Sequence, residues 1–346
     1  MTDSRALTIP QSRPVGVMAA ELPSIVDGGG SAARFAWEEF FAANIRNVHT
    51  RTAYMRAVRR FLEWLPADLV LTQITPGMVG TYFSNHPGSP PTRKLHLAAI
   101  RGLFDLMVTR HVMVLNPALS VRGERYQVME GKTPEISIDQ ARRLIGSIKT
   151  TRATRRNAAA VAGADDERPN TWNVVGLRDR AIVGCLIYTA ARAGAIARLR
   201  RKHFVYDGVQ WNLRFEEKGG KSREIPVRAD LQIYILEYLD AGGSRDDPGD
   251  TPLFQSATHW TCKLTGRAMT GVDVCRMVKR RLKAAGLPTH LSPHSFRVTT
   301  VTDLLTQGVP LEDVQYLAGH ADPRTTRLYD RRQKRVTRNI VERISV

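Results

Sequence analysis

The sequence predicts a mainly α-helical protein of two domains, an all-helical N-terminal domain and an α+β C-terminal domain with a small antiparallel sheet. Three observations support this fold class. The chain has 346 residues, enough for two hydrophobic cores. Apolar residues recur at helical spacing through most of its length. Short β-prone segments bounded by turns occur only between residues 204 and 227, which predicts the small sheet.

The N-terminal part divides into an arm and a helical domain. Residues 1–33 mix Pro, Ser and Gly without a sustained period, which predicts a flexible arm. A helix is expected to begin after Thr50 as its N-cap, and another follows the proline pair at 90–91. These helices belong to a predicted core domain over residues 34–118.

Residues 119–134 break the helical pattern with glycines and scattered charges, which predicts a linker. The C-terminal domain is expected over residues 135–346. Its predicted elements are a helix over 137–148 capped by Ser137, a surface insertion over 150–171, a strongly apolar helix over 177–188, strands at 204–206, 211–215 and 224–227, and helices from Asp230 onward.

The charge of the chain favours a polyanionic partner. Lys and Arg number 51 and Asp and Glu 33, which gives a net charge of +18. Nucleic acid is the commonest partner of such a protein. A merely basic soluble protein and a binder of membrane surfaces are the alternatives that composition leaves open.

Apolar runs and cysteines indicate where the protein acts. No apolar run approaches the roughly 18 residues that a membrane span needs, and no signal-peptide segment follows the first residues. Cys185, Cys262 and Cys275 form no CxxC pair. We therefore expect reduced thiols in the cytoplasm, no zinc site and no membrane partner.

Basic residues form two stripes on the predicted N-terminal helices. Arg56 and Arg59 point away from the apolar face of one helix, and Lys94 and Arg101 lie seven residues apart on another. Such stripes can bind DNA phosphates, although an ordinary solvated face is an equal alternative for either helix alone. Two stripes in one small domain favour double-stranded DNA.

The C-terminal half carries the residue types that move a phosphodiester without a metal. A phenol can act as the nucleophile, guanidinium groups neutralise charge on phosphoryl oxygens, and imidazole and ammonium groups move protons. The candidates, in chain order, are Arg192, Lys218, His294, Arg297, His320 and Tyr329.

The local context of these residues supports a site. Lys218 and Lys221 flank two glycines between predicted strands, which places both lysines at a hairpin tip. His294 and Arg297 are three residues apart at the start of a helix that Ser292 is expected to cap, where free amides favour a phosphate. A capping histidine beside a solvated arginine is the alternative.

A glycine and a proline also mark the turn before the tyrosine. Gly319 is expected to end one helix, and Asp322 to cap a short second helix that begins at Pro323 and carries Tyr329. A tyrosine on an amphipathic helix usually packs in a core. The joint occurrence of all six candidates favours chemistry instead.

With these residues together, the chain resembles the tyrosine recombinase (phage-integrase-like) family, and within it the Xer-type and Cre-like recombinases, from about residue 34 to its end. Three motifs carry the resemblance. They are Gly-Leu-Arg-Asp-Arg-Ala at 176–181 leading to Thr-Ala-Ala-Arg at 189–192, His-Ser-Phe-Arg at 294–297, and Leu-Ala-Gly-His at 317–320 followed by Thr-Thr-Arg-Leu-Tyr at 325–329. The resemblance implies the DNA breaking-rejoining fold of that family.

The resemblance also implies a role for each candidate. Arg192 and Arg297 would hold the scissile phosphate, and His320 would donate a hydrogen bond to it. His294 would exchange a proton with Tyr329, the nucleophile, giving a 3′-phosphotyrosyl enzyme and a free 5′-hydroxyl. Lys218 would be the general acid, with Lys221 as the fallback. No metal, ATP or other cofactor is implied, and integration, excision and resolution share this chemistry.

Family members assemble as tetramers on two duplexes, and the end of this chain fits that expectation. Its apolar stripe would dock a C-terminal helix into the neighbouring protomer, with packing inside the same subunit as the alternative; accessory proteins remain an open requirement. The stripe consists of Val336, Ile340, Val341 and Ile344, on a tail that also carries Arg335, Arg338 and Arg343.

Two positions depart from the family pattern. The family often has Gly where this chain has Ala190, and an acidic residue where it has Ala195; Glu216 or Glu217 could take over the role of that acid. Two rival functions stay open. A type IB topoisomerase uses much the same residues, and a DNA-binding regulator that has lost catalysis would explain Ala195.

Overall fold

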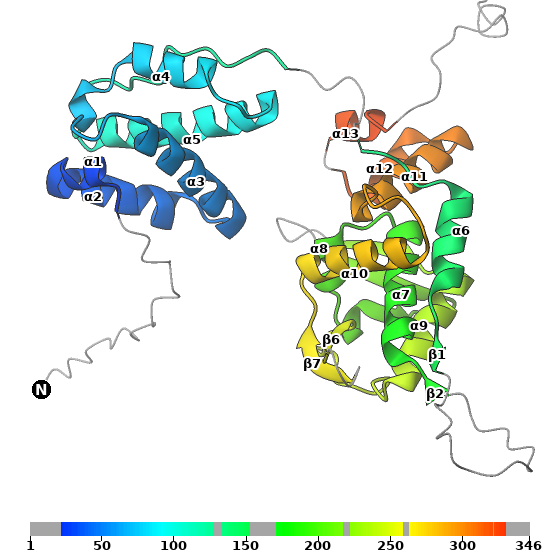
Figure 1. The fold of residues 1–346 in the computed structure, drawn as a ribbon. Coiled ribbons are helices and arrows are strands. Elements are labelled where there is room, and N and C mark those ends of the chain that lie inside the picture. The colour runs from blue at the N-terminus through cyan, green and yellow to red at the C-terminus, as the bar shows by residue number, and fades with distance from the viewer. Residues whose placement is uncertain are drawn as a thin grey trace, which may run out of the picture. The chain divides into compact units, whose positions relative to one another are not determined.

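The computed structural model describes residues 22–126, 133–152, 171–216, 222–258, 263–320 and 322–329. The chain forms two compact units, which divide between Gln127 and Val128. Helices predominate, and the strands form small antiparallel sheets, which confirms the predicted fold class (Figure 1).

All the regular secondary structure in the described part of the first unit is helical. In this unit the helices α3 and α2 pack against α5. In chain order the elements are α1 (Ser24–Asp27), α2 (Gly30–Glu38), a π-helical turn (Glu39–Asn44), α3 (Val48–Trp64), a 3₁₀ turn (Leu71–Gln73), α4 (Pro76–Ser84) and α5 (Pro90–Thr109).

Regular structure begins at Ser24, whereas the sequence predicts an arm up to residue 33. One of the glycines that suggested flexibility, Gly29, instead permits close packing. A Cβ atom on Gly29 would lie 2.7 Å from Leu71 Cδ1 and 2.8 Å from Ala33 Cβ, so only glycine fits there. Val26 is fully buried, which ties α1 to the core of the unit.

The helix α3 begins earlier than expected because Asn47, not Thr50, is its N-cap. The Asn47 side chain accepts hydrogen bonds from the backbone N–H groups of His49 and Thr50. The interior is rich in aromatic rings: Phe61 meets Tyr82 and Phe104 edge-on, at centroid distances of 5.1 and 6.1 Å.

The second unit combines helices with short strands. Its elements are α6 (Ile138–Ser147), β1 (Thr151–Arg152), β2 (Thr171–Trp172), α7 (Val174–Tyr188), α8 (Ala193–Ala197), a 3₁₀ turn (Arg201–His203), β3 (Phe204–Tyr206), β4 (Trp211–Glu216), β5 (Ser222–Pro226), α9 (Ala229–Ala241), β6 (Gln255–Ala257), β7 (Leu264–Ala268), α10 (Gly271–Ala284), α11 (Pro293–Thr306), α12 (Leu311–Ala318) and α13 (Pro323–Arg327).

The predicted sheet is confirmed as an antiparallel β3–β4–β5 meander. Leu213 on β4 pairs with Phe204 on β3 and with Ile225 on β5, and all three side chains are buried. The β6–β7 hairpin was not expected, because helices alone were predicted after Asp230. Its strands are short and carry no clear alternation of apolar and polar residues, so the sequence pattern gives no sign of it.

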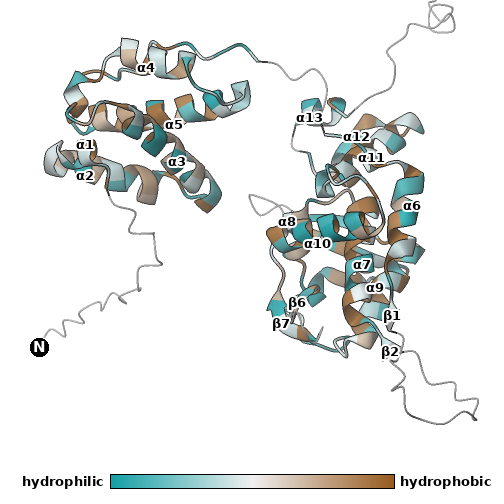
Figure 2. Ribbon diagram, viewed as in Figure 1, coloured by the Kyte–Doolittle hydropathy of each residue, from teal (hydrophilic) through white to brown (hydrophobic). Residues whose placement is uncertain are grey.

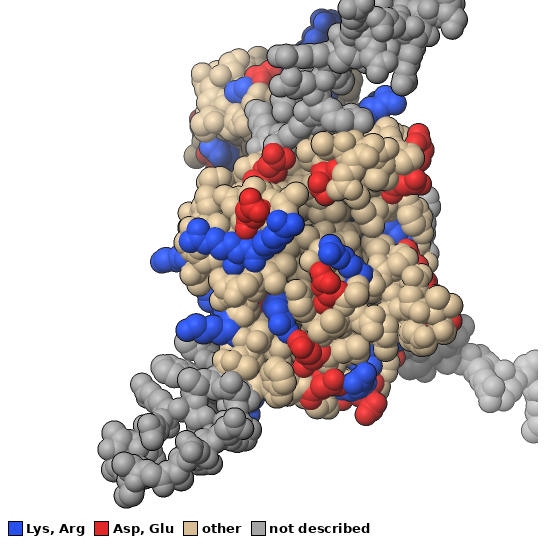
Figure 3. Space-filling model, turned by 90° about the vertical axis from the view of Figure 1, so that its right-hand side faces the viewer, with Lys and Arg blue, Asp and Glu red and all other residues tan. Residues whose placement is uncertain are grey.

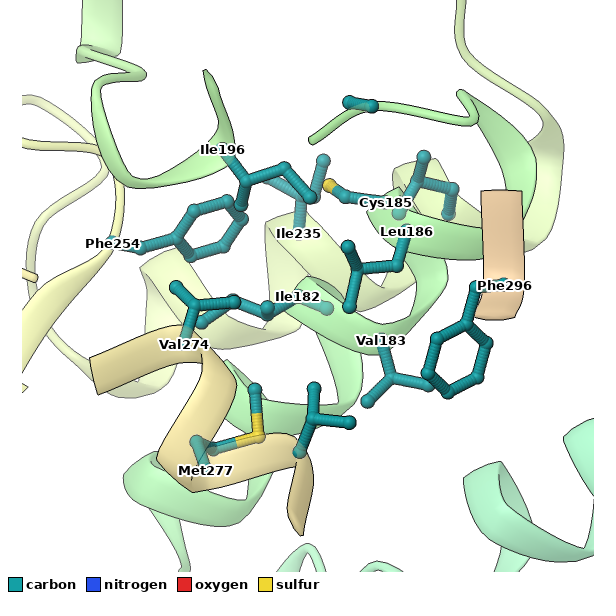
Figure 4. Close-up of a cluster of buried hydrophobic side chains, with 14 of the residues drawn as sticks. Ile182, Val183, Cys185, Leu186, Ile196, Ile235, Phe254, Val274, Met277 and Phe296 are labelled. Atoms are coloured by element: carbon teal, nitrogen blue, oxygen red, sulfur yellow. The ribbon is translucent and has the colours of Figure 1, made fainter. Parts of the chain in front are cut away.

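The core of the second unit surrounds α7. This helix is largely apolar and has buried residues on every side, as expected for a helix in a domain centre, and it packs most extensively on α9. Figure 4 shows side chains of α8, α9, α10 and α11 meeting those of α7. Helices nearer the surface, such as α10, show hydrophilic as well as hydrophobic residues in Figure 2.

A buried carboxylate connects α7 to α10. Asp179 is fully buried and lies 2.7 Å from Arg178, 3.0 Å from Arg280 and 2.7 Å from Arg281. Arg178 also donates to the backbone oxygen of Gln255, at 2.8 Å. A buried charge persists only with such partners, so this network fixes the helix that leads into Arg192.

None of the described helices is both long enough and apolar enough to cross a membrane.

Candidate active site

Three turns of the second unit and the segment after α13 carry the candidate catalytic side chains that the structure describes. The turn after α7 leads to Arg192, which directly precedes α8. The first turn of α11 carries His294 and Arg297. The turn between α12 and α13 carries His320, and Tyr329 follows α13. Segments that are far apart in the sequence therefore contribute to one place.

The turn between α12 and α13 has the predicted geometry. Gly319 ends α12 in the left-handed region, with φ 61°. The Asp322 side chain accepts a hydrogen bond from the backbone N–H of Arg324, at 2.8 Å, and so caps α13. One detail differs, because α13 ends at Arg327 and Tyr329 lies just beyond it.

The start of α11 also differs in one detail from the expectation. Ser292 is the N-cap by position, but its hydroxyl makes no capping bond. Its backbone N–H donates instead to the hydroxyl of Ser295, at 3.1 Å. Pro293 occupies the first turn, where a missing N–H costs nothing.

The Tyr329 hydroxyl lies 2.9 Å from Nε2 of His294. The tyrosine is 7% exposed, so its ring is held inside the unit. Its backbone oxygen accepts a hydrogen bond from the hydroxyl of Thr302 on α11, at 3.0 Å. Both ends of the residue are therefore anchored to the helix that carries His294.

The ring of His320 lies parallel to that of Tyr329, with an interplanar angle of 3° and a centroid distance of 5.5 Å. Nδ1 of His320 lies 2.9 Å from the hydroxyl of Thr326. Nε2 of the same ring is buried and has no hydrogen-bond partner among the described atoms. A buried polar atom without a partner in the protein commonly binds a ligand or a water molecule.

Arg297 is 1% exposed and is the largest fully buried side chain of the described chain. Its Nη1 donates to the backbone oxygen of Ala190, at 2.6 Å, while Nε and Nη2 find no partner among the described atoms. Ala190 has φ 49°, the left-handed region that favours glycine. That unusual backbone geometry presents the carbonyl to which Arg297 is bound.

Positive charge concentrates around the tyrosine. Burial, followed by the charge of Arg192, lowers the pKa of Arg297 to about 10, so the guanidinium stays charged at neutral pH. Burial, followed by the charges of Arg297 and Arg192, also lowers the pKa of His294, and lowers that of His320 to about 3. Both imidazoles are therefore neutral at pH 7. Arg192 itself is exposed.

Arg223 on β5 belongs to the same charged group, although the sequence did not single it out. Its side chain is 5% exposed, and its guanidinium lies over the ring of Phe215, 5.1 Å from the centroid. Its charge contributes to lowering the pKa values of Arg297 and His320. The sequence could not predict this role, because an arginine next to a hairpin is common and has no motif around it. The role becomes visible only when β5 is seen to fold beside the site.

Lys218 and Lys221 lie outside the described residues, in the part of the sequence between β4 and β5. Their assignment as general acid and as fallback or DNA contact stays a prediction. Of the two acids considered as replacements at Ala195, Glu217 also lies outside the described residues. Glu216 is directed toward His203, whose Nε2 is 3.2 Å from its carboxylate.

The predicted DNA-binding residues of the first unit have different surroundings. Arg56 is exposed, and Arg59 is half-buried. Lys94 donates to the backbone oxygen of Tyr126, at 3.2 Å. Arg101 donates to the backbone oxygens of Ala118 and Val121, so part of its donor capacity holds the segment after α5 in place.

These groups are suited to an anionic phosphodiester. A phenol lies in hydrogen-bond reach of a neutral imidazole, and unoccupied donors of a buried guanidinium lie in the same site. Such donors in a protected site stabilise negative charge that develops on phosphoryl oxygens. Among the described residues, no three His, Cys, Asp or Glu side chains lie together as a metal ion would require.

Comparison with protein families and curated proteins places this arrangement in a known context. The model of the phage integrase family matches residues 164–335. The tyrosine recombinase XerC of Pelobacter propionicus is 28% identical over 293 residues, which cover 81% of this chain and 84% of the relative. The tyrosine recombinase XerD of Pseudomonas putida is 25% identical over 295 residues, covering 81% and 86%.

Solved structures show the same fold. The XerH site-specific recombinase bound to palindromic difH substrate, a post-cleavage complex, has a TM-score of 0.63 at 19% identity, covering 82% of this chain and 76% of that one. A lambda integrase dimer bound to a COC′ core site also has a TM-score of 0.63, at 16% identity, covering 91% and 79%.

Proposed function

Because the chain belongs to the phage integrase family of tyrosine recombinases, which are site-specific recombinases, we propose that it cleaves and rejoins DNA through Tyr329. The observation that carries this proposal is the Tyr329 hydroxyl, 2.9 Å from a neutral His294 and beside the buried guanidinium of Arg297. A nucleophile within reach of its base is the signature of covalent catalysis.

In the cleavage step, the Tyr329 oxygen attacks the scissile phosphorus while its proton passes to Nε2 of His294. The bond from phosphorus to the 5′ oxygen breaks, and that oxygen takes a proton from Lys218. The products are a 3′-phosphotyrosyl enzyme and a 5′-hydroxyl. Arg192 and Arg297 neutralise the negative charge that grows on the non-bridging oxygens.

Rejoining is the same step in reverse. The ester keeps the energy of the broken bond, so a 5′-hydroxyl from a second duplex can displace Tyr329 without ATP. Strand exchange needs two duplexes, and a lambda integrase tetramer bound to a Holliday junction has the same fold as this chain. A tetramer joined through the C-terminal tail, acting on double-stranded DNA in the cytoplasm, completes the proposal.

The test is formation of a covalent adduct. The full chain is incubated with a nicked suicide duplex that carries the cognate site, located beforehand by footprinting, and adduct is measured on denaturing gels. Wild type is expected to accumulate adduct, whereas Tyr329→Phe is expected to form none, because the attacking oxygen is gone. The matched control is Tyr316→Phe, which alters an exposed tyrosine on α12 and should leave the adduct unchanged.

Two results would count against the proposal. Absence of adduct with wild type on a verified site would favour a DNA-binding regulator, and adduct with Tyr329→Phe would assign the nucleophile elsewhere. Relaxation of supercoiled plasmid that lacks paired sites would favour the topoisomerase alternative.

A further inference from the structure

A buried threonine lies beside the imidazole that faces the proposed phosphate site. Thr326 on α13 is fully buried, and His320 is 6% exposed. The threonine hydroxyl lies 2.9 Å from Nδ1 of His320, and Nε2 on the other side of the ring is buried without a partner among the described atoms. The ring therefore has one nitrogen bound inside the protein and one available to a ligand.

The direction of this hydrogen bond follows from the single proton of the hydroxyl. Thr299 and Thr300 on α11 direct theirs to backbone oxygens: those of Ile136 and Ile187, at 2.7 and 2.6 Å, with the oxygens four residues earlier at 3.0 Å. Within the described chain, the hydroxyl of Thr326 makes no such bond, and Nδ1 of His320 is its one hydrogen-bond partner. If the ring donated instead, the hydroxyl proton would be buried without an acceptor, at a cost of about 1–3 kcal/mol.

We propose that Thr326 is a positioning residue that donates to Nδ1 and thereby holds His320 as the tautomer with its proton on Nε2. The bond at one ring nitrogen decides which nitrogen carries the proton. Nε2 then presents a donor to a non-bridging oxygen of the scissile phosphate. This assignment rests on the function proposed for Tyr329, whose ring lies parallel to that of His320.

The opposite tautomer would turn a lone pair of Nε2 toward the phosphate and repel it. Protonation cannot supply the missing donor, because burial and the charge of Arg297 lower the pKa of His320 to about 3. A neutral ring offers one N–H only, so the choice of tautomer decides whether His320 assists or opposes DNA cleavage.

The first experiment reads the tautomer directly and needs no DNA. The full chain is labelled with ¹⁵N-histidine, the His320 signals are assigned with His320→Gln, and the shifts of both ring nitrogens are measured at pH 7.5. Wild type is expected to show the proton on Nε2. In Thr326→Val, which removes the hydroxyl but keeps the shape, a substantial population should carry it on Nδ1. A wild-type proton on Nδ1, or unchanged shifts in Thr326→Val, would overturn the proposal.

The second experiment measures adduct formation on the nicked duplex. Thr326→Val is expected to slow cleavage in proportion to the population that loses the donor, up to about 10²-fold, the low end for complete loss of one oxyanion donor, with DNA affinity unchanged. Thr326→Ser restores the hydroxyl and should restore the rate. Thr325→Val, in the same short helix, should cleave normally. Equal slowing of the Val and Ser variants would show a structural role and refute the assignment.

The two experiments keep the hypotheses separate. If wild type forms no adduct, the proposed function fails, while the nitrogen shifts still decide whether Thr326 sets the tautomer. If adduct forms but the shifts contradict the assignment, only the role of Thr326 is lost. Urea unfolding of each variant verifies that the compared proteins are folded.

Discussion

Ala190 shows how a single backbone conformation can shape the site. Its φ of 49° is sterically costly for any residue with a side chain, yet its carbonyl is the one that holds Arg297. The alanine methyl is fully buried in a small cluster that also contains Tyr329, so its burial offsets part of the strain.

Two substitutions at Ala190 separate strain from packing. Ala190→Gly should change the free energy of unfolding by less than about 1 kcal/mol, because relief of about 1–2 kcal/mol of strain is opposed by a lost methyl and a more flexible unfolded chain. Ala190→Val should destabilise by at least about 2 kcal/mol, because a β-branched residue at this φ is strained and the site is full. Urea unfolding measures both. If Ala190→Val leaves the free energy of unfolding unchanged, the turn can relax to accommodate the larger side chain.

At this scale, the sequence identified residues that meet in the fold better than it identified the contacts that support them. The structure brings Tyr329, His294 and Arg297 together, and the motifs had named all three. Arg223 and Thr326 were not selected. Their contributions depend on burial and on the direction of one hydrogen bond, and neither can be deduced from residue type and spacing.

Two histidines link α4 to α5 in the first unit. His86 follows α4, and its Nδ1 accepts from the N–H of Gly88, so Nε2 carries the proton and donates to Nδ1 of His96, at 3.1 Å. Burial, followed by the charges of His86 and Arg60, lowers the pKa of His96 to about 4. Proton uptake would abolish the acceptor in this pair.

The sign of the pH effect follows from this shift. Between about pH 6.5 and 4 the unfolded chain holds a proton on His96 and the folded chain does not, so stability is full above pH 6.5 and declines as the pH falls. The loss is at most about 3 kcal/mol. Urea titrations at pH 7.5 and 5, followed by hydrogen exchange of the amides in α4 and α5, should show a lower free energy of unfolding at pH 5.

A variant pair identifies the group responsible. His96→Gln should reduce the difference between the two pH values, whereas His49→Gln, an exposed change on α3, should retain it. An undiminished difference in His96→Gln would assign the effect to another group.

Elements with complete local signals were predicted well. Ser137 and Gln140 form a capping box at the start of α6, and β3, β4 and β5 lie between clear turns. The helix α1, the first residues of α2 and the β6–β7 hairpin were missed for a different reason. Gly29, directly before α2, serves packing between elements, and the hairpin is held by Arg178 and Tyr238, whose bonds to Gln255 are remote in sequence.

At the scale of the whole molecule, the main physical property is charge. A net charge of +18 predicts that DNA binding depends strongly on salt. On the face drawn in Figure 3, basic and acidic side chains both appear, so the excess of positive charge is not concentrated there. Backbone contacts must then use particular basic groups, and the two stripes of the first unit are the candidates.

Affinity for a labelled cognate duplex, measured by fluorescence anisotropy between 50 and 200 mM salt, should fall about 10³-fold or more if roughly six phosphates are contacted. Arg56→Gln combined with Lys94→Gln should lower the slope of log K against log salt by about two. Arg34→Gln, an exposed arginine paired with Asp27, is the control and should leave the slope unchanged. If the slope is unchanged when Arg56 and Lys94 are both replaced, neither residue contacts a DNA phosphate.

The crowding of Arg192, Arg223 and Arg297 near one phenol has a consequence for the resting enzyme. Like charges held close together oppose folding, and within the described chain no carboxylate forms an ion pair with Arg192 or Arg297. Repulsion among these guanidinium groups therefore lowers the stability of the fold around Tyr329. If the proposed function is right, the phosphodiester of a bound DNA strand supplies the counter-charge, and DNA is expected to stabilise the folded protein.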